Sequence, residues 1–285
     1  MKQKPTIGLV MKSLQAEFFQ EMKKGALAFA SRQTNFNLIT LGTSTQTEID
    51  LQIELIDTLI KEKVDALVVV PIDSKALVPV IVKAAASGIK VINIDIKLDE
   101  NLLEQHGVSL SYVGPDNKTA AKMVGDVLAK KLGAGTNVMI IEGLRVAENA
   151  QQRKQGFMES INEYHLNLVA SEAADWETDK AAQVFTQLLS EHPDVDGVMC
   201  CNDAMALGVI RVLEMNGKTG IIPVVGFDND AAVQPLLASG ALLATIDAFG
   251  PQMAVQGIEY ALKVLEGMEN KGSYTTQFKL ILSDK

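Results

Sequence analysis

The chain carries one pattern twice, and this repeat constrains its fold more than any other feature of the sequence. Residues 64–77 and residues 195–207 each begin with Val-Asp, continue as an apolar run, and pass through a short polar loop into a helix-like stretch. Each copy is followed by a second apolar run that ends in aspartate, at Asp95 and at Asp228. A repeat with so long a period predicts two similar α/β domains in tandem.

Short runs of Val, Ile and Leu alternate with longer amphipathic stretches along the chain. Continuous apolar strands joined by helices are typical of parallel sheets that are covered on both faces. The sequence therefore predicts an α/β protein with two Rossmann-like (flavodoxin-like) parallel-sheet domains. Strands are expected at 5–11, 36–42, 65–70, 90–95, 110–113, 136–142, 166–171, 196–201, 222–227 and 242–246, and helices at 16–33, 46–62, 75–87, 117–132, 148–163, 178–191, 202–216 and 229–238.

The pattern changes after Thr245, where an amphipathic helix at 250–267 precedes a last strand at 277–282. This tail is too short for a third domain, so we expect the helix to cover the first domain and the strand to join the second. The chain then crosses between the domains three times, which permits opening about a hinge while limiting sliding. The expected crossings are 113–116, 245–248 and 276–278, and the expected domains are 1–114 with 248–277 and 115–247 with 278–285.

Composition and charge exclude several classes of partner. The formal net charge is −9 and the pI is about 4.9, which disfavours a nucleic-acid surface and an anionic membrane surface. No apolar run approaches the roughly 18 residues that are needed to span a bilayer. The chain begins without a signal peptide and runs directly into a strand, so we expect a cytoplasmic protein or a mature exported domain whose leader is not included.

Motifs for catalysis, metals and cofactors fail when their spacing is tested. No G-x-G-x-x-G follows the first strand and no G-x-S-x-G occurs, while Val212 stands where a phosphate loop ending at Lys218-Thr219 needs glycine. The three histidines lie far apart, without metal-ligand spacing. Cys200 and Cys201 are neighbours on an expected strand and point to opposite faces, so no disulfide is expected. We therefore expect no catalytic residue, no metal and no cofactor.

Polar residues follow several of the expected strands at their carboxyl ends, where parallel sheets bind ligands. Asp95 and Asp228 could each accept two hydrogen bonds from ligand hydroxyls across a cleft between the domains. Asn202 opens a helix, so it is either a helix cap or a ligand contact. Lys12 after the first strand and Arg153 early in a helix are weaker candidates, because most such charges are solvated.

Aromatic residues are only 5% of the chain, so Phe18, Phe19 and Trp176 stand out. A flat ring packs well on the C–H face of a sugar or polyol, although aromatic residues at a helix start are often part of a core. Asn117 fits a glycosylation pattern with Thr119, but we expect it to cap the helix that follows.

The order and spacing of several short stretches resemble type I periplasmic solute-binding proteins of the ribose, allose and galactose type. The resemblance runs from Thr6 to Leu282. The matching stretches are Phe18-Phe19, 71–74, 93–95, 114–117, 174–176, 201–208 and 225–228. Each stretch alone is a weak signal, whereas the ordered set is specific.

This resemblance implies a function as well as a fold. It implies a receptor that closes about its hinge on a small neutral sugar or polyol and delivers it to the membrane permease of an ABC importer. The receptor would be an extracytoplasmic or periplasmic monomer. The implied contacts are Phe18, Phe19 and Trp176 sandwiching the ligand, with Asp95, Arg153, Asn202, Asp228 and Lys12 binding its polar groups.

The sequence also departs from the ribose-type pattern at four positions. Ala16 and Val70 replace asparagines, Ile96 replaces an arginine, and Ala248 replaces a glutamine. Each missing hydrogen bond would cost about 1–3 kcal/mol for a ligand that needs it, so we expect a ligand other than ribose. Asp247, beside Ala248, is expected to restore one acceptor.

Three rival functions share parts of this pattern. The effector-binding core of a lactose-repressor-like transcription factor has the same architecture but carries a DNA-binding head. The sugar-sensing domain of a signalling system would bind a similar ligand and contact a membrane kinase. An enzyme would need a phosphate loop or an acid/base pair that the sequence lacks.

Overall fold

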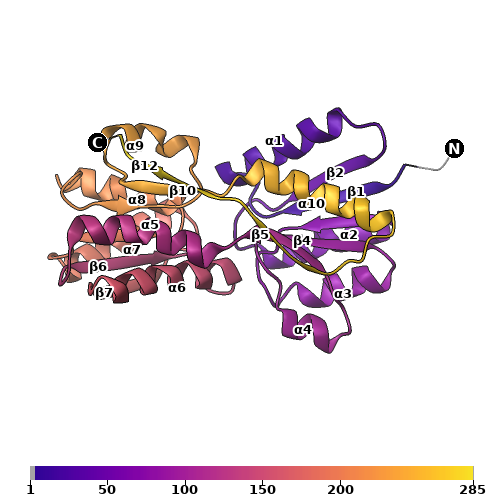
Figure 1. The fold of residues 1–285 in the computed structure, drawn as a ribbon, viewed down its shortest axis with the longest axis horizontal. Helices are drawn as coiled ribbons and strands as arrows, with labels where there is room; N and C mark the ends of the chain where they lie inside the picture. Colours follow the sequence, from indigo (N-terminus) through magenta and orange to yellow (C-terminus); the bar gives the residue numbers. More distant parts are fainter. Residues whose placement is uncertain (1–3, 285) are drawn as a thin grey trace. The chain divides into compact units, whose positions relative to one another are not determined.

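The computed structural model describes residues 4–284, which form two compact units of similar construction (Figure 1). Unit 1 comprises the chain up to Pro115, the segment Val146–Glu148 and Phe249–Thr276. Unit 2 comprises Asp116–Arg145, Asn149–Ala248 and the chain from Gln277. The short segment Val146–Glu148 groups with unit 1 by its contacts, although the sequence placed it in the second domain.

Unit 1 is built on a six-stranded sheet in the order β11-β5-β4-β3-β1-β2, and every strand pair in it is parallel. Its last strand, β11, did not emerge from the sequence because it is short, polar and largely exposed. The strands are β1 (Thr6–Met11), β2 (Asn37–Gly42), β3 (Ala66–Val69), β4 (Lys90–Ile94), β5 (Ser111–Pro115) and β11 (Gly272–Thr276).

Helices cover both faces of this sheet (Figure 1). Alternate residues of β3 show how, because Leu67 and Val69 pack with Ile56 of α2, whereas Val68 lies against Gly257 of α10. Helix α10 therefore returns from the end of the chain to cover unit 1, beside α1. The helices are α1 (Glu17–Ser31), α2 (Ile49–Lys61), α3 (Val78–Ala86), α4 (Glu100–Gln105) and α10 (Gly250–Leu265), of which the six-residue α4 was not expected.

Unit 2 repeats the plan with the sheet order β12-β10-β9-β8-β6-β7. The last strand β12 pairs antiparallel with β10, and the other pairs are parallel. Helices α5 and α6 pack against each other through Gly125 and Gly156, and α7 and α8 pack together on the other face (Figure 1). The elements are α5 (Asn117–Leu132), β6 (Asn137–Glu142), α6 (Glu148–Glu163), β7 (Asn167–Ala173), α7 (Thr178–Glu191), β8 (Gly197–Cys200), α8 (Asp203–Met215), β9 (Val224–Val225), a 3-10 turn (Ala231–Val233), α9 (Gln234–Ser239), β10 (Ala244–Asp247) and β12 (Lys279–Leu282).

The duplicated sequence pattern corresponds to duplicated hydrogen bonds. The carboxylate of Asp65 accepts from the backbone N–H of Thr6 at 2.7 Å, 59 residues away. The carboxylate of Asp196 accepts from the N–H of Asn137 at the same distance and the same separation. The expected α/β fold with two mainly parallel-sheet domains is confirmed. Within residues 4–284, no helix is both long enough and apolar enough to cross a membrane.

Candidate functional site

Asp95 and Asp228 hold the backbone in the left-handed region at equivalent positions of the two units. Asp95 follows β4 with a φ of 63°, and Asp228 follows β9 with a φ of 116°. The N–H of Asp95 donates to the carbonyl of Val113 at 3.0 Å, and the N–H of Asp228 donates to the carbonyl of Ile246 at 2.7 Å. Such a backbone costs about 1–3 kcal/mol for a residue with a side chain. Strain retained twice at one place of a duplicated fold points to a functional use of these carboxylates.

The loop around Asp95 is fixed by buried polar side chains. The hydroxyl of Tyr112 donates to the carbonyl of Asp95 at 2.9 Å. Asn93 donates to the carbonyl of Ile96 at 2.7 Å and accepts from the N–H of Leu98 at 2.8 Å, so it bridges the turn that carries Asp95. The backbone that carries Asp95 is therefore held in one position at the end of β4.

Lys12 and the two phenylalanines lie together in unit 1. Lys12 follows β1 and is only 2% exposed, with its Nζ 5.5 Å from the centre of the Phe19 ring. The rings of Phe18 and Phe19 meet edge to face, with centres 5.2 Å apart. Phe18 is half-buried against the start of α10, where a Cβ on Gly250 would come within 2.9 Å of its ring. Unit 1 thus holds a buried cation beside aromatic surface.

Arg153 is the centre of the candidate site in unit 2. It is 3% exposed, and its Nε donates to Oδ1 of Asn117 at 2.9 Å. Its Nη1 donates to the carbonyl of Cys201 at 2.8 Å and lies 3.4 Å from Oδ1 of Asp228. Within residues 4–284, these hydrogen bonds engage Nε and Nη1 and leave the N–H groups of Nη2 for a ligand.

Two aromatic rings flank this guanidinium group. The Cζ of Arg153 lies 3.6 Å from the centre of the Phe227 ring and 5.5 Å from the Trp176 ring. Trp176 itself has a φ of 71° and fits only because residue 143 is glycine, since a Cβ on Gly143 would overlap the indole. A cation held against ring faces stays in a defined plane, which suits directional hydrogen bonding.

Asn202 and Asp247 complete the predicted residues of unit 2. Asn202 is the N-cap of α8, and its Oδ1 accepts from the N–H of Met205 at 2.9 Å. In the described part of the chain its Nδ2 makes no hydrogen bond, so the cap does not exclude a ligand contact. Asp247 ends β10, and its Oδ2 accepts from Nδ2 of Asn229, the neighbour of Asp228, at 3.2 Å.

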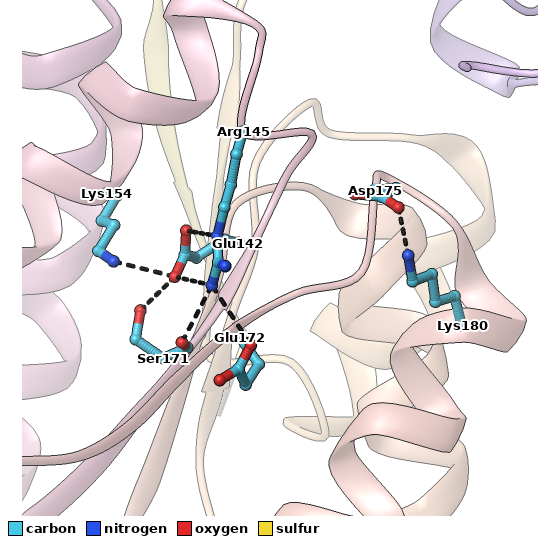
Figure 2. Close-up of polar contacts among 7 residues, drawn as sticks. All are labelled: Glu142, Arg145, Lys154, Ser171, Glu172, Asp175 and Lys180. Carbon is cyan, nitrogen blue, oxygen red and sulfur yellow. Dashed lines mark hydrogen bonds and ion pairs between the residues drawn. The ribbon is translucent and has the colours of Figure 1, made fainter. Parts of the chain in front are cut away.

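A second network in unit 2 is centred on Glu142 at the end of β6 (Figure 2). The Glu142 carboxylate accepts from Arg145 at 3.1 Å, from Lys154 at 2.9 Å and from the Ser171 hydroxyl at 2.7 Å. Burial alone would raise the pKa of Glu142, but these hydrogen bonds outweigh burial and lower it to about 2. Glu142 therefore stays ionised and fixes Lys154, which directly follows Arg153 on α6.

Some residues of the site differ from the sequence-based expectation. Asp116, not Asn117, caps α5, because its carboxylate accepts from the N–H of Thr119 at 3.0 Å. Asn117 is fully buried and orients Arg153, so the cap assignment was wrong. The contacts of Phe227 and Glu142 were not predicted, although Glu142 ends β6 and Phe227 lies two residues beyond β9.

The four departures from the ribose-type pattern leave apolar side chains in the fold. Val70, Ile96 and Ala248 are each at most 1% exposed, and Ala16 is partly buried. Ile96 lies just beyond Asp95 after β4, Ala248 follows Asp247 after β10, and Val70 follows the neighbouring strand β3. The polar contacts missing at these positions are thus replaced by apolar surface.

The two thiols do not form a nucleophilic site. Cys200 and Cys201 are free and fully buried. Burial raises the pKa of Cys201 to about 12 and that of Cys200 well above its usual value, so neither forms a thiolate at neutral pH. Among residues 4–284, no group of His, Cys, Asp or Glu side chains is arranged to hold a metal ion.

Known proteins resemble the chain over both units. Residues 7–269 match the family described as periplasmic binding protein domain. A D-ribose/D-allose-binding protein of Pseudomonas aeruginosa is 41% identical over 284 residues, which are 98% of this chain and 89% of that protein. An ABC transporter solute binding protein of Burkholderia multivorans is 41% identical with a TM-score of 0.95, covering 98% of this chain and 99% of the other. One from Actinobacillus succinogenes with bound D-allose is 33% identical with a TM-score of 0.93, covering 99% and 98%.

Proposed function

The chain belongs to the periplasmic binding protein domain family, and we propose that it is the periplasmic receptor of an ABC importer for a small neutral sugar or polyol. The similar proteins are a D-ribose/D-allose-binding protein and solute binding proteins of ABC transporters. The observation that carries the proposal for this chain is the buried Arg153, held between Phe227 and Trp176 and 3.4 Å from Asp228.

The arrangement in unit 2 suits a polyhydroxylated ligand. Carboxylate oxygens of Asp228 accept hydrogen bonds from hydroxyl groups, and Nη2 of Arg153 and Nδ2 of Asn202 donate to hydroxyl oxygens. The Trp176 ring offers a flat apolar surface for the C–H face of a sugar ring. Donors, acceptors and an aromatic surface together match what a neutral sugar presents, and the opposite charges of Arg153 and Asp228 leave this part of the site without a net charge.

Unit 1 supplies a second set of groups, and we propose that both sets bind the same ligand. Asp95 accepts hydroxyl hydrogen bonds, Lys12 donates them, and Phe18 and Phe19 cover an apolar face of the ring. A ligand that contacts both units favours the state in which both can reach it, and this ligand-selected state is what a permease would recognise. Each copy of the chain carries both sets, so the receptor would act as a monomer.

The apolar residues of unit 1 narrow the class of ligand. Val70 and Ile96 offer no hydrogen bonds, so a hydroxyl group placed against them would lose its partner at a cost of about 1–3 kcal/mol. The ligand is therefore proposed to have an edge without hydroxyls on this side, as in a deoxy sugar, or a configuration different from ribose. Lys12 adds one donor that such a ligand would use.

The test is direct binding of defined compounds to the purified protein. Trp176 is the single tryptophan of the chain, so its fluorescence reports on this site alone. D-allose, D-ribose, a 6-deoxyhexose, ribitol and myo-inositol are titrated, and thermal unfolding is measured beside them. At a concentration 100-fold above the dissociation constant, a true ligand stabilises the protein by about 2.7 kcal/mol. Absence of both signals across sugars and polyols would reject the function.

A further inference from the structure

Asp203 is a fully buried carboxylic acid to which the proposed binding chemistry assigns no role. It is the first residue of α8 and is 0% exposed. Its two oxygens accept hydrogen bonds from the Thr245 hydroxyl at 2.8 and 3.0 Å. Helix α8 already has Asn202 as its cap, so capping does not explain Asp203. A buried acid is costly, and its retention calls for another explanation.

The contacts of Asp203 lie on either side of Asp228 and its neighbour Asn229, whose backbones are left-handed. Its N–H donates to the carbonyl of Phe227 at 2.7 Å, and its Oδ2 accepts from the N–H of Asp230 at 3.1 Å. Between these two anchors lie Asp228 and Asn229, with φ values of 116° and 58°. The segment Asp228–Asn229 is thus tied to Asp203 at both ends, at one end through the Asp203 N–H and at the other through its carboxylate.

The surrounding residues make room for this carboxylate. A Cβ on Gly226 would overlap Oδ1 of Asp203, so the side chain at that position has to be absent. Thr245 also accepts from the N–H of Asn229 at 3.4 Å, which adds a second tie to the same loop. Burial, and then the charge of Asp228, raise the pKa of Asp203 well above its usual value, while the hydrogen bonds from Thr245 and Asp230 oppose this. The two acids are therefore electrostatically coupled as well as joined by backbone.

We propose that Asp203 is a positioning residue, which with Thr245 fixes the left-handed loop at Asp228 and so aims the Asp228 carboxylate at the ligand. The inference rests on the proposed sugar-binding function. It adds two residues that touch no ligand themselves and set the affinity through Asp228. A purely structural role would instead support the packing of α8 without a specific effect on Asp228.

The test compares conservative variants by Trp176 fluorescence with the tightest-binding compound among D-allose, D-ribose and myo-inositol. Thr245→Val keeps the shape and removes the hydroxyl, and it is expected to weaken binding about tenfold. Thr245→Ser keeps the hydroxyl and should stay within about twofold of the parent. Thr186→Val removes the hydroxyl of an exposed threonine in α7 that donates to the Ala182 carbonyl, and it should leave affinity unchanged.

A double-mutant cycle separates positioning from general support. In an Asp228→Asn background, Thr245→Val should cause no further loss, because its effect passes through the Asp228 carboxylate. Asp203→Ala should weaken binding at least as much as Thr245→Val in the parent. Unchanged affinity of Thr245→Val, or the same fold-loss in both backgrounds, would overturn the inference.

Failure of the proposed function is distinguishable from failure of this inference. If the parent protein binds none of the three compounds, the function fails, and amide hydrogen exchange then tests the loop directly. The N–H groups of Asp228 and Asp230 should exchange at least about tenfold faster in Thr245→Val than in the parent or Thr186→Val. Unchanged protection in Thr245→Val would overturn the positioning role.

Discussion

The Nη1 of Arg153 lies 3.4 Å from Oδ1 of Asp228, and both side chains are almost fully buried. Charge-assisted hydrogen bonds are usually about 2.7–2.9 Å long, so this pair is close without forming a tight ion pair. Separate anchors hold each partner, since Asn117 and the carbonyl of Cys201 orient Arg153 while the β10 backbone fixes Asp228. The pair therefore offers a donor and an acceptor side by side to a ligand hydroxyl.

The fork geometry of Arg153 should matter more than its charge. Arg153→Lys keeps the charge but loses the planar set of donors and the stacking on Phe227. We expect sugar affinity, measured by Trp176 fluorescence, to fall about 10- to 100-fold. Arg211→Lys is the matched control, because Arg211 is half-exposed in a surface pair with Asp179, and its affinity should equal that of the parent. Full retention of affinity in Arg153→Lys would contradict the assigned role.

Gly143 should control the position of Trp176. Gly143→Ala places a methyl group where the indole lies, so the ring has to move or the strand has to shift. We expect a changed emission maximum of the single tryptophan, a loss of about 1–3 kcal/mol in the free energy of unfolding, and weaker sugar binding. An unchanged emission spectrum would show that the ring does not rest on residue 143.

The left-handed backbone of Asp228 should lower the stability of the fold while its carboxylate serves ligand binding. Asp228→Gly removes the steric cost of a φ of 116°, and we expect the free energy of unfolding to rise by about 1 kcal/mol while sugar affinity is lost. Lys63 is a matched control, since it is exposed with a φ of 57° outside the site. Lys63→Gly should stabilise the protein without changing affinity. Urea unfolding and sugar titration of both variants give the comparison.

Glu142 should support the fold above acidic pH. Its folded-state pKa, about 2, lies below the ordinary value of 4.5, so its stabilising effect is present above pH 4.5 and is lost as the pH falls through 2. Glu142→Gln is expected to lower the free energy of unfolding at pH 7 by about 2 kcal/mol, allowing for the partly exposed partners Arg145 and Lys154.

Urea unfolding should show that the difference in the free energy of unfolding between Glu142→Gln and the parent shrinks steadily from pH 5 to pH 2. Glu172→Gln serves as the control, because Glu172 is largely exposed and contacts Arg145 at 3.3 Å. The free energy of unfolding of Glu172→Gln should stay within about 0.5 kcal/mol of the parent value at every pH. A pH-independent difference for Glu142→Gln would mean that packing, and not its charge, is what the variant removes.

Much of the fold follows from the sequence because buried parallel strands are apolar along their whole length. The expected runs at 65–70 and 196–201 correspond to β3 and β8, whose residues are all buried. The strand β11 was not predicted, because its sequence Gly-Ser-Tyr-Thr-Thr has neither an apolar run nor an alternating pattern and lies at an exposed edge of the sheet. Edge strands of this kind take their pairing from tertiary context, which a single sequence does not contain.

The residues of the candidate site likewise fall into two groups, those that the local sequence indicates and those whose contacts form only in the folded protein. Asp95 and Asp228 were predicted as site residues because each ends an apolar run in a repeated pattern. Asn117 was misassigned because Asp116 and Asn117 are both good cap residues, and only the position of Arg153 from a distant helix decides between them. The stacking of Arg153 on Phe227 likewise depends on two segments that meet only in the folded protein.

The central claim is that aspartates of both units bind one sugar. Isothermal titration of the best ligand into the parent, Asp95→Asn and Asp228→Asn tests it most directly, because asparagine tolerates the left-handed backbone and keeps the side-chain shape while it removes the charge and one acceptor oxygen. Asp194→Asn, an exposed aspartate outside the site, is the control. We predict one bound sugar per parent chain and an affinity loss of at least about tenfold in each site variant. Unchanged affinity in either site variant, or two independent sites in the parent, would contradict the account.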